Sequence, residues 1–485
     1  MITLWSLVQI IYFLVVIIVC LRIIYDTESF SKALAYLLLV VLLPIFGMVF
    51  YLSFGINYRK RKLYSKKLIV DDELSKTLKK DILGQSEIAL KNAKSSLREY
   101  RKIINMMTTE TINSISDNNH VELLFNGEEK FPKVIETLKK AKHHIHIEYY
   151  IFEDDTIGNQ IVDILIEKAK EGIEVRFIFD DFGSRPVRGK MLKRMREAGV
   201  KVFPFHRVIF IYLANRLNYR NHRKIIIVDG VEAFIGGINV SDRYINYPDR
   251  EQTYWRDTHL YLKGQAAYIL QHTFMCDWNF CANDRLGPTV DYFPPLPPIN
   301  EVNNKVVQIA ASGPDSKVPT VLYSLLQIIN LAKEEVLITT PYFIPGESMM
   351  DAIIVTTLSK VKVKLLIPGV SDSWLVNAAA RSYYNDLLEA GVEIYVYKKG
   401  FVHAKTLVVD RNIAVVGTAN MDYRSFDLNF EINAIVYDET IATELSDAFY
   451  EDVKSSDFIV PEEWLNRAKG TQLLEKGARL MSPLL

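Results

Sequence analysis

The sequence has few cysteines and no excess of charge of either sign. Three cysteines, Cys20, Cys276 and Cys281, are spread through 485 residues, which favours a reducing compartment over a disulfide framework. No second Cys/His pair lies near Cys276 and Cys281, so packed thiols are favoured there over a metal site. With 58 basic and 58 acidic residues, the chain is not a generally basic nucleic-acid binder. Any anionic partner must therefore be met by a local cluster of charge.

The N-terminal region lacks charge over two long runs, Ile2–Leu21 and Ala33–Tyr58. At about 1.5 Å per residue, each run is long enough to cross the roughly 30 Å of bilayer hydrocarbon. Pro44 and Gly47 in the second run are tolerated better in membrane helices than in soluble ones. Buried soluble helices seldom run this long without a charged edge, and a cleaved signal peptide would begin with Lys or Arg. The sequence predicts a hairpin of two transmembrane helices over residues 1–58.

The flanks of these runs predict their orientation. The loop between them balances Arg22 and Lys32 against Asp26 and Glu28. By the positive-inside rule, the excess of basic residues after the second run places the large remainder of the chain on the cytoplasmic side. The same cluster would be attracted to anionic lipid headgroups, by about 1 kcal/mol per charge. Its members are Arg59, Lys60, Arg61, Lys62, Lys66 and Lys67.

The region after the membrane runs has the pattern of an α/β protein. Residues 59–117 begin with the basic cluster and continue as a charged, helix-favouring connector. Beyond them strand-like and helix-like runs alternate. "VELLF" at 121–125 predicts a strand, Asn126-Gly127 a turn and the residues after Pro132 a helix, before a strand from His144. The second half repeats this order, with strands from Val306 and Val336 around a helix after Pro319.

Internal duplication is the leading feature of this region. "EAGVKVFPF" at 197–205 corresponds to "EAGVEIYVY" at 389–397, 192 residues later, whereas the motifs described below are 181 residues apart. The first half therefore carries 11 extra residues, near the apolar stretch 208–217, which is either a buried loop or a loop that meets a membrane or lines a lipid groove. The proline-rich stretch at 287–300 marks a boundary. We predict two α/β halves, 118–300 and 301–485.

A polar motif, His-x-Lys-x-x-x-x-Asp, occurs once in each half, in "NHRKIIIVDG" and "VHAKTLVVD". On a strand, residues two apart project to the same face, so each motif presents an imidazole beside an ammonium group. That pairing suits a phosphate, and the asparagine seventeen residues after each histidine adds neutral hydrogen-bond donors. The two aspartates lie on the opposite strand face, where bracing the strand end is favoured over touching substrate. The candidate catalytic residues are His222, Lys224, Asp229, His403, Lys405 and Asp410, with Asn239 and Asn420 as candidate phosphate ligands.

The doubled motif, together with "GGIN" and "GTANMDYRSFDLNFE", resembles the phospholipase D superfamily. With the two apolar runs, "YWRDTHL" at 254–260 and the closing "RLMSPLL", the chain is similar to bacterial cardiolipin synthases over nearly its whole length. The resemblance implies two halves packed about a pseudo-two-fold axis, with both motifs in one site and no metal or other cofactor required. It also implies that a carboxylate beyond each asparagine orients a histidine. Glu431 fits this pattern, and Asp257, at a longer spacing, is the candidate in the first half.

The activity implied by the resemblance is phosphatidyl transfer between two phosphatidylglycerol molecules, giving cardiolipin and glycerol through a phosphohistidine. His222 is favoured as the nucleophile and His403 as acid and base, which a trapped intermediate digested to peptides would test. The partners implied are phosphatidylglycerol and other anionic lipids of the bacterial cytoplasmic membrane, without nucleic acid; homo-oligomer formation is left open.

Three alternative functions are weighed against this activity. A phospholipase D-type hydrolase, or a transphosphatidylase with another alcohol, uses the same intermediate and differs in how the site excludes water. A nuclease is disfavoured by the zero net charge and the two apolar runs. A non-catalytic membrane scaffold is disfavoured because both motifs keep their histidine and lysine.

Overall fold

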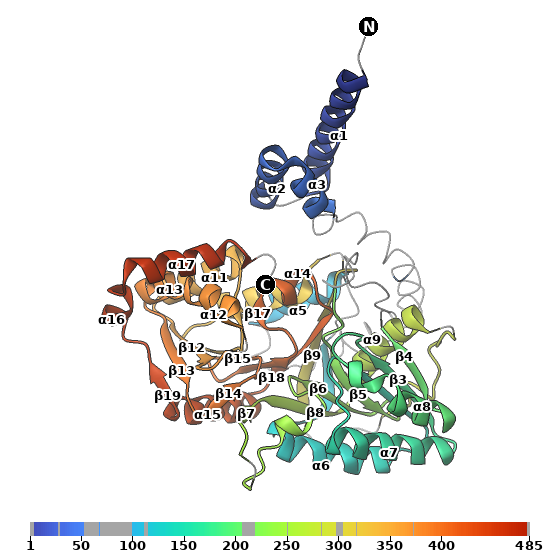
Figure 1. Ribbon diagram of the computed structural model, residues 1–485. Helices are drawn as coiled ribbons and strands as arrows, with labels where there is room; N and C mark the ends of the chain where they lie inside the picture. Colours follow the sequence, from blue (N-terminus) through green and yellow to red (C-terminus); the bar gives the residue numbers. More distant parts are fainter. Residues whose placement is uncertain are drawn as a thin grey trace. The chain divides into compact units, whose positions relative to one another are not determined.

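The chain divides into two compact units in the computed structural model (Figure 1). The first comprises Met1–Ile69 and Val208–Tyr219, and the second Val70–Arg207 and Arg220–Leu485. The apolar insertion at 208–217 and most of the connector predicted at 59–117 lie outside the described residues. The structure describes residues 4–27, 30–52, 67, 99–110, 115–205, 219–249, 251–282, 284–296, 304–316, 318–371 and 373–482.

The first unit contains three apolar helices, α1 (Leu4–Asp26), α2 (Phe30–Leu42) and α3 (Pro44–Phe50). Among the described residues only α1, with a mean hydropathy of 2.8, is long and apolar enough to cross a membrane. The second predicted span is not one continuous helix. Pro44 disfavours helical backbone in the residue before it, and Leu43 accordingly has φ −133° and ψ 69°. The chain then folds back so closely that a Cβ on Gly47 would lie 2.5 Å from the Leu39 carbonyl oxygen.

One 15-stranded sheet forms the framework of the second unit. In each half the strands run in the same spatial order from the edge inwards: β4-β3-β2-β5-β6-β8-β1 in the first and β13-β12-β10-β15-β16-β18-β9 in the second, with β19 outside β13. The halves meet where β1 and β9 pair antiparallel, with Ile115 opposite Gln308. Figure 1 shows the first half, mostly green, and the second half, orange to red, on either side of β9 and β18. The arrangement confirms an α/β fold built from two repeated halves.

The strands have the following bounds. In the first half they are β1 (Ile115–Phe125), β2 (His144–Tyr149), β3 (Glu174–Phe179), β4 (Lys201–Pro204), β5 (Lys224–Val228), β6 (Glu232–Gly236) and β8 (Thr258–Gly264). In the second they are β9 (Lys305–Ser312), β10 (Glu335–Thr339), β12 (Lys362–Pro368), β13 (Glu393–Tyr397), β15 (Thr406–Val409), β16 (Ile413–Gly417), β18 (Glu431–Tyr437) and β19 (Ser456–Phe458). The motif lysine Lys224 thus begins β5, and Thr406, which begins β15, directly follows Lys405. The two motif histidines precede their strands.

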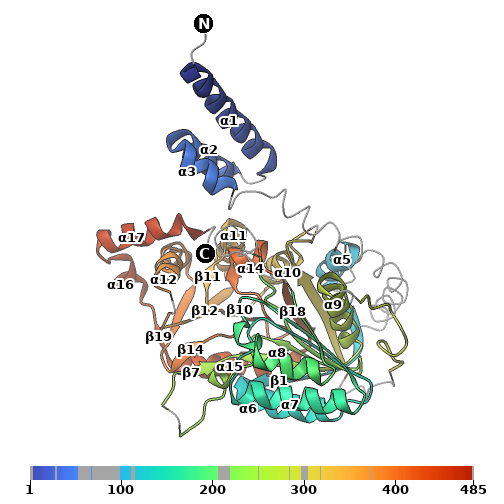
Figure 2. The ribbon, with the colours of Figure 1, turned by 45° about the vertical axis from the view of Figure 1, so that its right-hand side comes forward.

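Helices cover the sheet and give each half its own apolar core, seen from a second direction in Figure 2. In the first half these are α6 (Asn126–Lys139), α7 (Thr156–Lys170), α8 (Lys190–Glu197) and α9 (Ala266–Cys281). The second half has α10 (Thr320–Asn330), α11 (Glu347–Leu358), α12 (Trp374–Arg381), α13 (Tyr384–Ala390), α14 (Tyr423–Asp427), α15 (Glu439–Lys454), α16 (Pro461–Leu465) and α17 (Lys469–Arg479). Helix α5 (Arg101–Glu110), from the connector, packs against α10.

The start of α6 corrects the sequence interpretation. The helix predicted only after Pro132 is wrong, because α6 begins directly after β1. Asn126 itself has left-handed backbone, with φ 59°, as expected for the predicted turn. The Glu129 carboxylate reaches back and accepts a hydrogen bond of 2.8 Å from the Phe125 backbone N–H. This contact satisfies a donor at the helix N-terminus and allows an early start.

The aspartates that end the two motifs brace the turns behind their strands. Asp229 and Asp410 both have left-handed backbone, with φ of 53° and 50°. The Asp410 carboxylate accepts hydrogen bonds of 2.8 Å from the backbone N–H groups of three consecutive residues, Lys333, Glu334 and Glu335. Asp229 does the same for the three residues from Lys142, at 2.8 to 3.0 Å. Both side chains therefore fix the entry into the neighbouring strand, as expected from their position in the motif.

Replacing Asp410 by alanine is expected to lower stability rather than remove the chemistry. The variant leaves three backbone donors without their acceptor, which should cost about 1–3 kcal/mol. Thermal unfolding of the detergent-solubilised protein measures the loss, and the activity of the folded fraction should be retained. Asp447→Ala is the control, because its exposed pair with Arg411 should contribute little. Wild-type stability with lost activity would contradict the bracing role.

Candidate active site

Short extended segments hold each motif histidine against the opposite half. The His222 backbone N–H donates to the Phe430 carbonyl oxygen at 3.0 Å, and the Phe430 N–H donates to the Arg220 carbonyl oxygen at 2.8 Å. On the other side β14 (Gly400–Val402) pairs in parallel with β7 (Tyr254–Arg256), and the His403 N–H donates to the Arg256 carbonyl oxygen at 2.7 Å. Each histidine is thus hydrogen-bonded to the residue that precedes a carboxylate of the other half.

Those carboxylates contact the imidazole rings crosswise. His222 Nδ1 lies 2.9 and 3.0 Å from the two carboxylate oxygens of Glu431, and His403 Nδ1 lies 2.6 Å from Asp257 Oδ2. A carboxylate accepts only, so Nδ1 of each neutral ring carries the proton and Nε2 keeps its lone pair. Neither Nε2 has a hydrogen-bond partner among the described residues. The two imidazoles thus have the same tautomer, each held through Nδ1 by a carboxylate of the other half.

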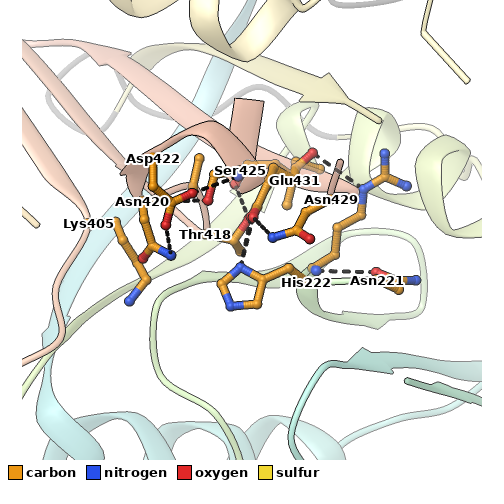
Figure 3. A network of polar contacts seen from close by, with 12 residues as sticks. Asn221, His222, Lys405, Thr418, Asn420, Asp422, Ser425, Asn429 and Glu431 are labelled. Carbon is orange, nitrogen blue, oxygen red and sulfur yellow. Dashed lines mark hydrogen bonds and ion pairs between the residues drawn. The ribbon is translucent and has the colours of Figure 1, made fainter. Parts of the chain in front are cut away.

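The Glu431 carboxylate is itself held by side chains that the sequence analysis did not single out (Figure 3). It accepts hydrogen bonds from the Thr418 hydroxyl and from Asn429 Nδ2, the latter at 3.1 Å. Asp257 is fully buried and accepts from the Thr258 backbone N–H at 2.7 Å. Both residues lie in the stretch "GTANMDYRSFDLNFE", Thr418 directly after its first residue and Asn429 two residues before Glu431. Their proximity to Asn420 and Glu431 in the sequence could have identified them as candidates. These contacts fix the orientation of the carboxylates.

Aromatic rings surround the two histidines and exclude solvent from them. The Tyr150 ring lies edge-on to His222, with ring centroids 4.7 Å apart. Trp255 and Tyr244 lie beside His403, at 5.6 and 5.8 Å. Burial, more than any neighbouring charge, lowers the pKa of His222 to about 4 and that of His403 to about 3. Both rings are therefore neutral near pH 7 in the free protein, the form in which an imidazole is a nucleophile.

The two motif lysines lie between these pairs. Lys224 Nζ donates to the carbonyl oxygen of His222 at 2.7 Å, and Lys405 Nζ donates to that of His403. Burial lowers the pKa of Lys224 to about 7, with the Lys405 charge contributing, and burial lowers the pKa of Lys405 to about 8. Two ammonium groups forced together in a water-poor site favour an anion between them.

The two predicted phosphate-binding asparagines have partners inside the protein. Asn239 Nδ2 donates to the Tyr244 hydroxyl at 2.7 Å, and its Oδ1 accepts from the Ile151 N–H at 3.3 Å. Asn420 Nδ2 donates to Asp422 Oδ2 at 3.1 Å. Both amides thus tie loops around the histidines, and each uses one of the two N–H donors of its Nδ2, which leaves the second donor for a further acceptor.

Comparison with known proteins identifies the family. The family model described as cardiolipin synthase, PLD-like domain, matches residues 134–264 and 325–453, and one described as phospholipase D-nuclease N-terminal matches residues 10–55. The chain is 38% identical to the cardiolipin synthase of Alkalihalophilus pseudofirmus, over 98% of this chain and 93% of that protein. It is 39% identical to the major cardiolipin synthase ClsA of Bacillus subtilis, over 95% of each.

Solved structures agree on the fold. Phosphatidylserine synthase of Haemophilus influenzae matches with a TM-score of 0.59 at 14% identity, covering 81% of this chain and all of that one. At this identity the likeness concerns the fold alone. The family models, by contrast, cover the motif of each half, and the curated relatives extend over nearly the full length. The chain belongs to the cardiolipin synthases, phosphatidyltransferases of the phospholipase D superfamily.

Proposed function

We propose that the protein transfers a phosphatidyl group between two phosphatidylglycerol molecules, giving cardiolipin and glycerol through a phosphohistidine intermediate. The crosswise contacts of His222 with Glu431 and of His403 with Asp257 carry the proposal. They give one site two imidazoles with the same free nitrogen, which is what attack on phosphorus and proton transfer require. Lys224 and Lys405 supply the positive charge for the non-bridging oxygens.

The first step forms the intermediate. The lone pair of His222 Nε2 attacks phosphorus, and the bond from phosphorus to the head-group glycerol oxygen breaks. His403, as an imidazolium, gives its proton to the departing oxygen, so that glycerol leaves neutral. The anionic phosphodiester favours this imidazolium, because a nearby negative charge raises the pKa of an imidazole. We assign the attack to His222 on the family resemblance.

The second step returns both histidines to the protonation states that they had, with lipid bound, before the first step. The terminal hydroxyl of the second phosphatidylglycerol attacks phosphorus, and the bond from phosphorus to His222 Nε2 breaks. His403, now neutral, takes the hydroxyl proton and becomes the imidazolium again. The aromatic surroundings keep water low at the intermediate, which favours a lipid alcohol over hydrolysis.

We further propose that the N-terminal unit anchors the enzyme in the bilayer, with α1 crossing it and the apolar run 33–58 returning the chain to the cytoplasmic side, where the two α/β halves lie. The basic residues at 59–67 support this orientation. The domain limits proposed are 1–58, 59–117, 118–300 and 301–485.

Purified protein incubated in detergent with phosphatidylglycerol alone should yield cardiolipin and free glycerol. His222→Ala and His403→Ala should each lower the rate by at least about a hundredfold, since each removes a reacting group. Lipid chromatography and a glycerol assay measure the products, and unchanged membrane insertion serves as the control. Phosphatidic acid as the sole product would indicate a hydrolase, and near-normal activity of either variant would exclude a shared site.

Affinity for the lipid should fall as pH rises from 7 to 9. In the free protein Lys224 loses its proton above about pH 7 and Lys405 above about pH 8. A bound phosphodiester raises the pKa of both lysines, so binding takes up protons in this pH range. The apparent KM for short-chain phosphatidylglycerol should therefore increase over this range. Calorimetry in buffers of different ionisation enthalpy should detect the proton uptake near pH 8. Proton release on binding would contradict the placement of the phosphate between the lysines.

Single-cysteine labelling tests the orientation. In a background with the three native cysteines replaced by serine, Tyr25→Cys marks the exposed end of α1 and Thr471→Cys marks the exposed surface of α17. An impermeant maleimide should label position 25 in spheroplasts and position 471 only in inverted vesicles. Labelling of both positions from the same side would show that the second apolar run, which lies between them in the chain, does not cross the bilayer as proposed.

A further inference from the structure

Arg220 is a buried arginine without a countercharge in contact. Its residue exposure is 7%, yet its guanidinium has no ion pair and no hydrogen bond to another side chain within the described part of the chain. Its contact is the Phe182 ring, whose centroid lies 4.2 Å from the guanidinium carbon. Burying an unpaired charge is costly, so native proteins seldom retain one without a partner. The arginine therefore points to an anion that binds beside it.

Two further arginines lie around the same place. Arg185 stacks on the same Phe182 ring, with its guanidinium carbon 4.6 Å from the centroid, and Arg424 approaches from the second half. Burial lowers the pKa of Arg220, and the charges of Arg424 and Arg185 lower it further against the opposing effect of Asp180. Asp180 is the nearby carboxylate, but its oxygens accept from backbone N–H groups, including that of Asn221 at 3.1 Å. The cluster keeps a net positive charge.

The cluster lies next to the reacting group. Arg220 and His222 flank the contact with Phe430 in extended backbone, where residues two apart project to the same side about 7 Å from each other. The side chains of Arg220 and His222 therefore start from the same side of this segment, with the Arg220 guanidinium over the Phe182 ring. The Tyr150 ring, which contacts His222, lies near both Arg220 and Arg424.

The pseudo-symmetric place in the other half is built differently. At 181 residues from Arg220 stands Phe401, whose ring lies 6.0 Å from that of His403. The residue that corresponds to Arg424 is Arg243, which is paired with Glu153 at 3.2 Å. Arginines without an ion pair among the described residues therefore occur near His222 but not at the corresponding positions near His403. The fold itself does not require them.

We propose that Arg185, Arg220 and Arg424 form a second phosphate subsite, which binds the phosphodiester of the acceptor phosphatidylglycerol while its glycerol hydroxyl reaches the phosphohistidine. This inference rests on the proposed function. In cardiolipin only a glycerol bridge separates the two phosphates, which fits a subsite lateral to His222. Guanidinium groups bind phosphate oxygens in pairs, so the cluster is suited to a lipid phosphodiester. The leaving glycerol of the first step carries no phosphate and makes no use of it.

Two reactions of the same enzyme separate the subsite from the catalytic centre. Exchange of labelled glycerol into phosphatidylglycerol needs only the phosphohistidine and glycerol, whereas cardiolipin formation needs the acceptor phosphate. Arg220→Gln and Arg424→Gln should each lower cardiolipin formation about ten- to a hundredfold, as expected for the loss of charge-assisted contacts. Glycerol exchange should stay within about twofold of wild type. Arg220→Lys, which keeps the charge, should restore part of the loss.

Arg243→Gln is the matched control, and both of its reactions should resemble those of wild type. Equal loss of exchange and cardiolipin formation in the Arg220 and Arg424 variants would overturn the subsite, as would loss confined to Arg243→Gln. Absence of both reactions in the wild type would instead reject the proposed function. Inorganic phosphate should inhibit cardiolipin formation by wild type more strongly than by Arg220→Gln, in which only the site between the two motif lysines can still bind it. Equal inhibition of the two proteins would show that the anion binds elsewhere and contradict the assignment.

Discussion

Each motif histidine is held by a carboxylate that belongs to the other half of the chain. Glu431 opens β18 in the second half and contacts His222, while Asp257 stands directly before β8 in the first half and contacts His403. Neither half can therefore build an oriented imidazole alone. The two halves must therefore be held firmly against each other, because reacting groups have to stay aligned to within a fraction of an ångström. The continuous sheet across β1 and β9 does this, together with the backbone hydrogen bonds of His222 and His403 to the opposite half.

Burial of these pairs determines the chemistry of the free site. Removing water disfavours every charged form, so both histidines become neutral and both lysines lose much of their preference for the proton. Without a bound anion, the lowered pKa values of the lysines and histidines favour their unprotonated forms. A bound anion raises these pKa values and favours protonation. In the proposed reaction the negative charge of the substrate phosphate stabilises the protonated lysines, so the same charge supports both binding and catalysis.

The sequence predicted the repeated α/β halves and the two polar motifs, because these depend on strand periodicity and on a spacing that occurs twice. The candidate carboxylates followed from the resemblance to the phospholipase D superfamily. It did not predict which carboxylate meets which histidine, since that depends on contacts between residues more than 140 positions apart. The start of α6 was missed because the side chain of Glu129 satisfies a helix donor that the apolar pattern does not report. The break at Leu43 was missed for the opposite reason, since hydropathy counted the run as continuous while Pro44 divides it.

The symmetry of the fold makes its departures informative. The two halves provide equivalent nitrogens and equivalent lysines, yet the transfer that we propose is not symmetric, because one lipid gives a phosphatidyl group and the other keeps its own phosphate. A second anion must be accommodated beside the first without entering the catalytic pair. The halves differ near these histidines in two ways. Arg220 corresponds to the uncharged Phe401, and Arg424, for which no ion pair is found among the described residues, corresponds to Arg243, which is paired with Glu153. A duplicated phosphodiester site can in this way acquire a preference for a second anionic lipid through side chains that leave the catalytic geometry unchanged.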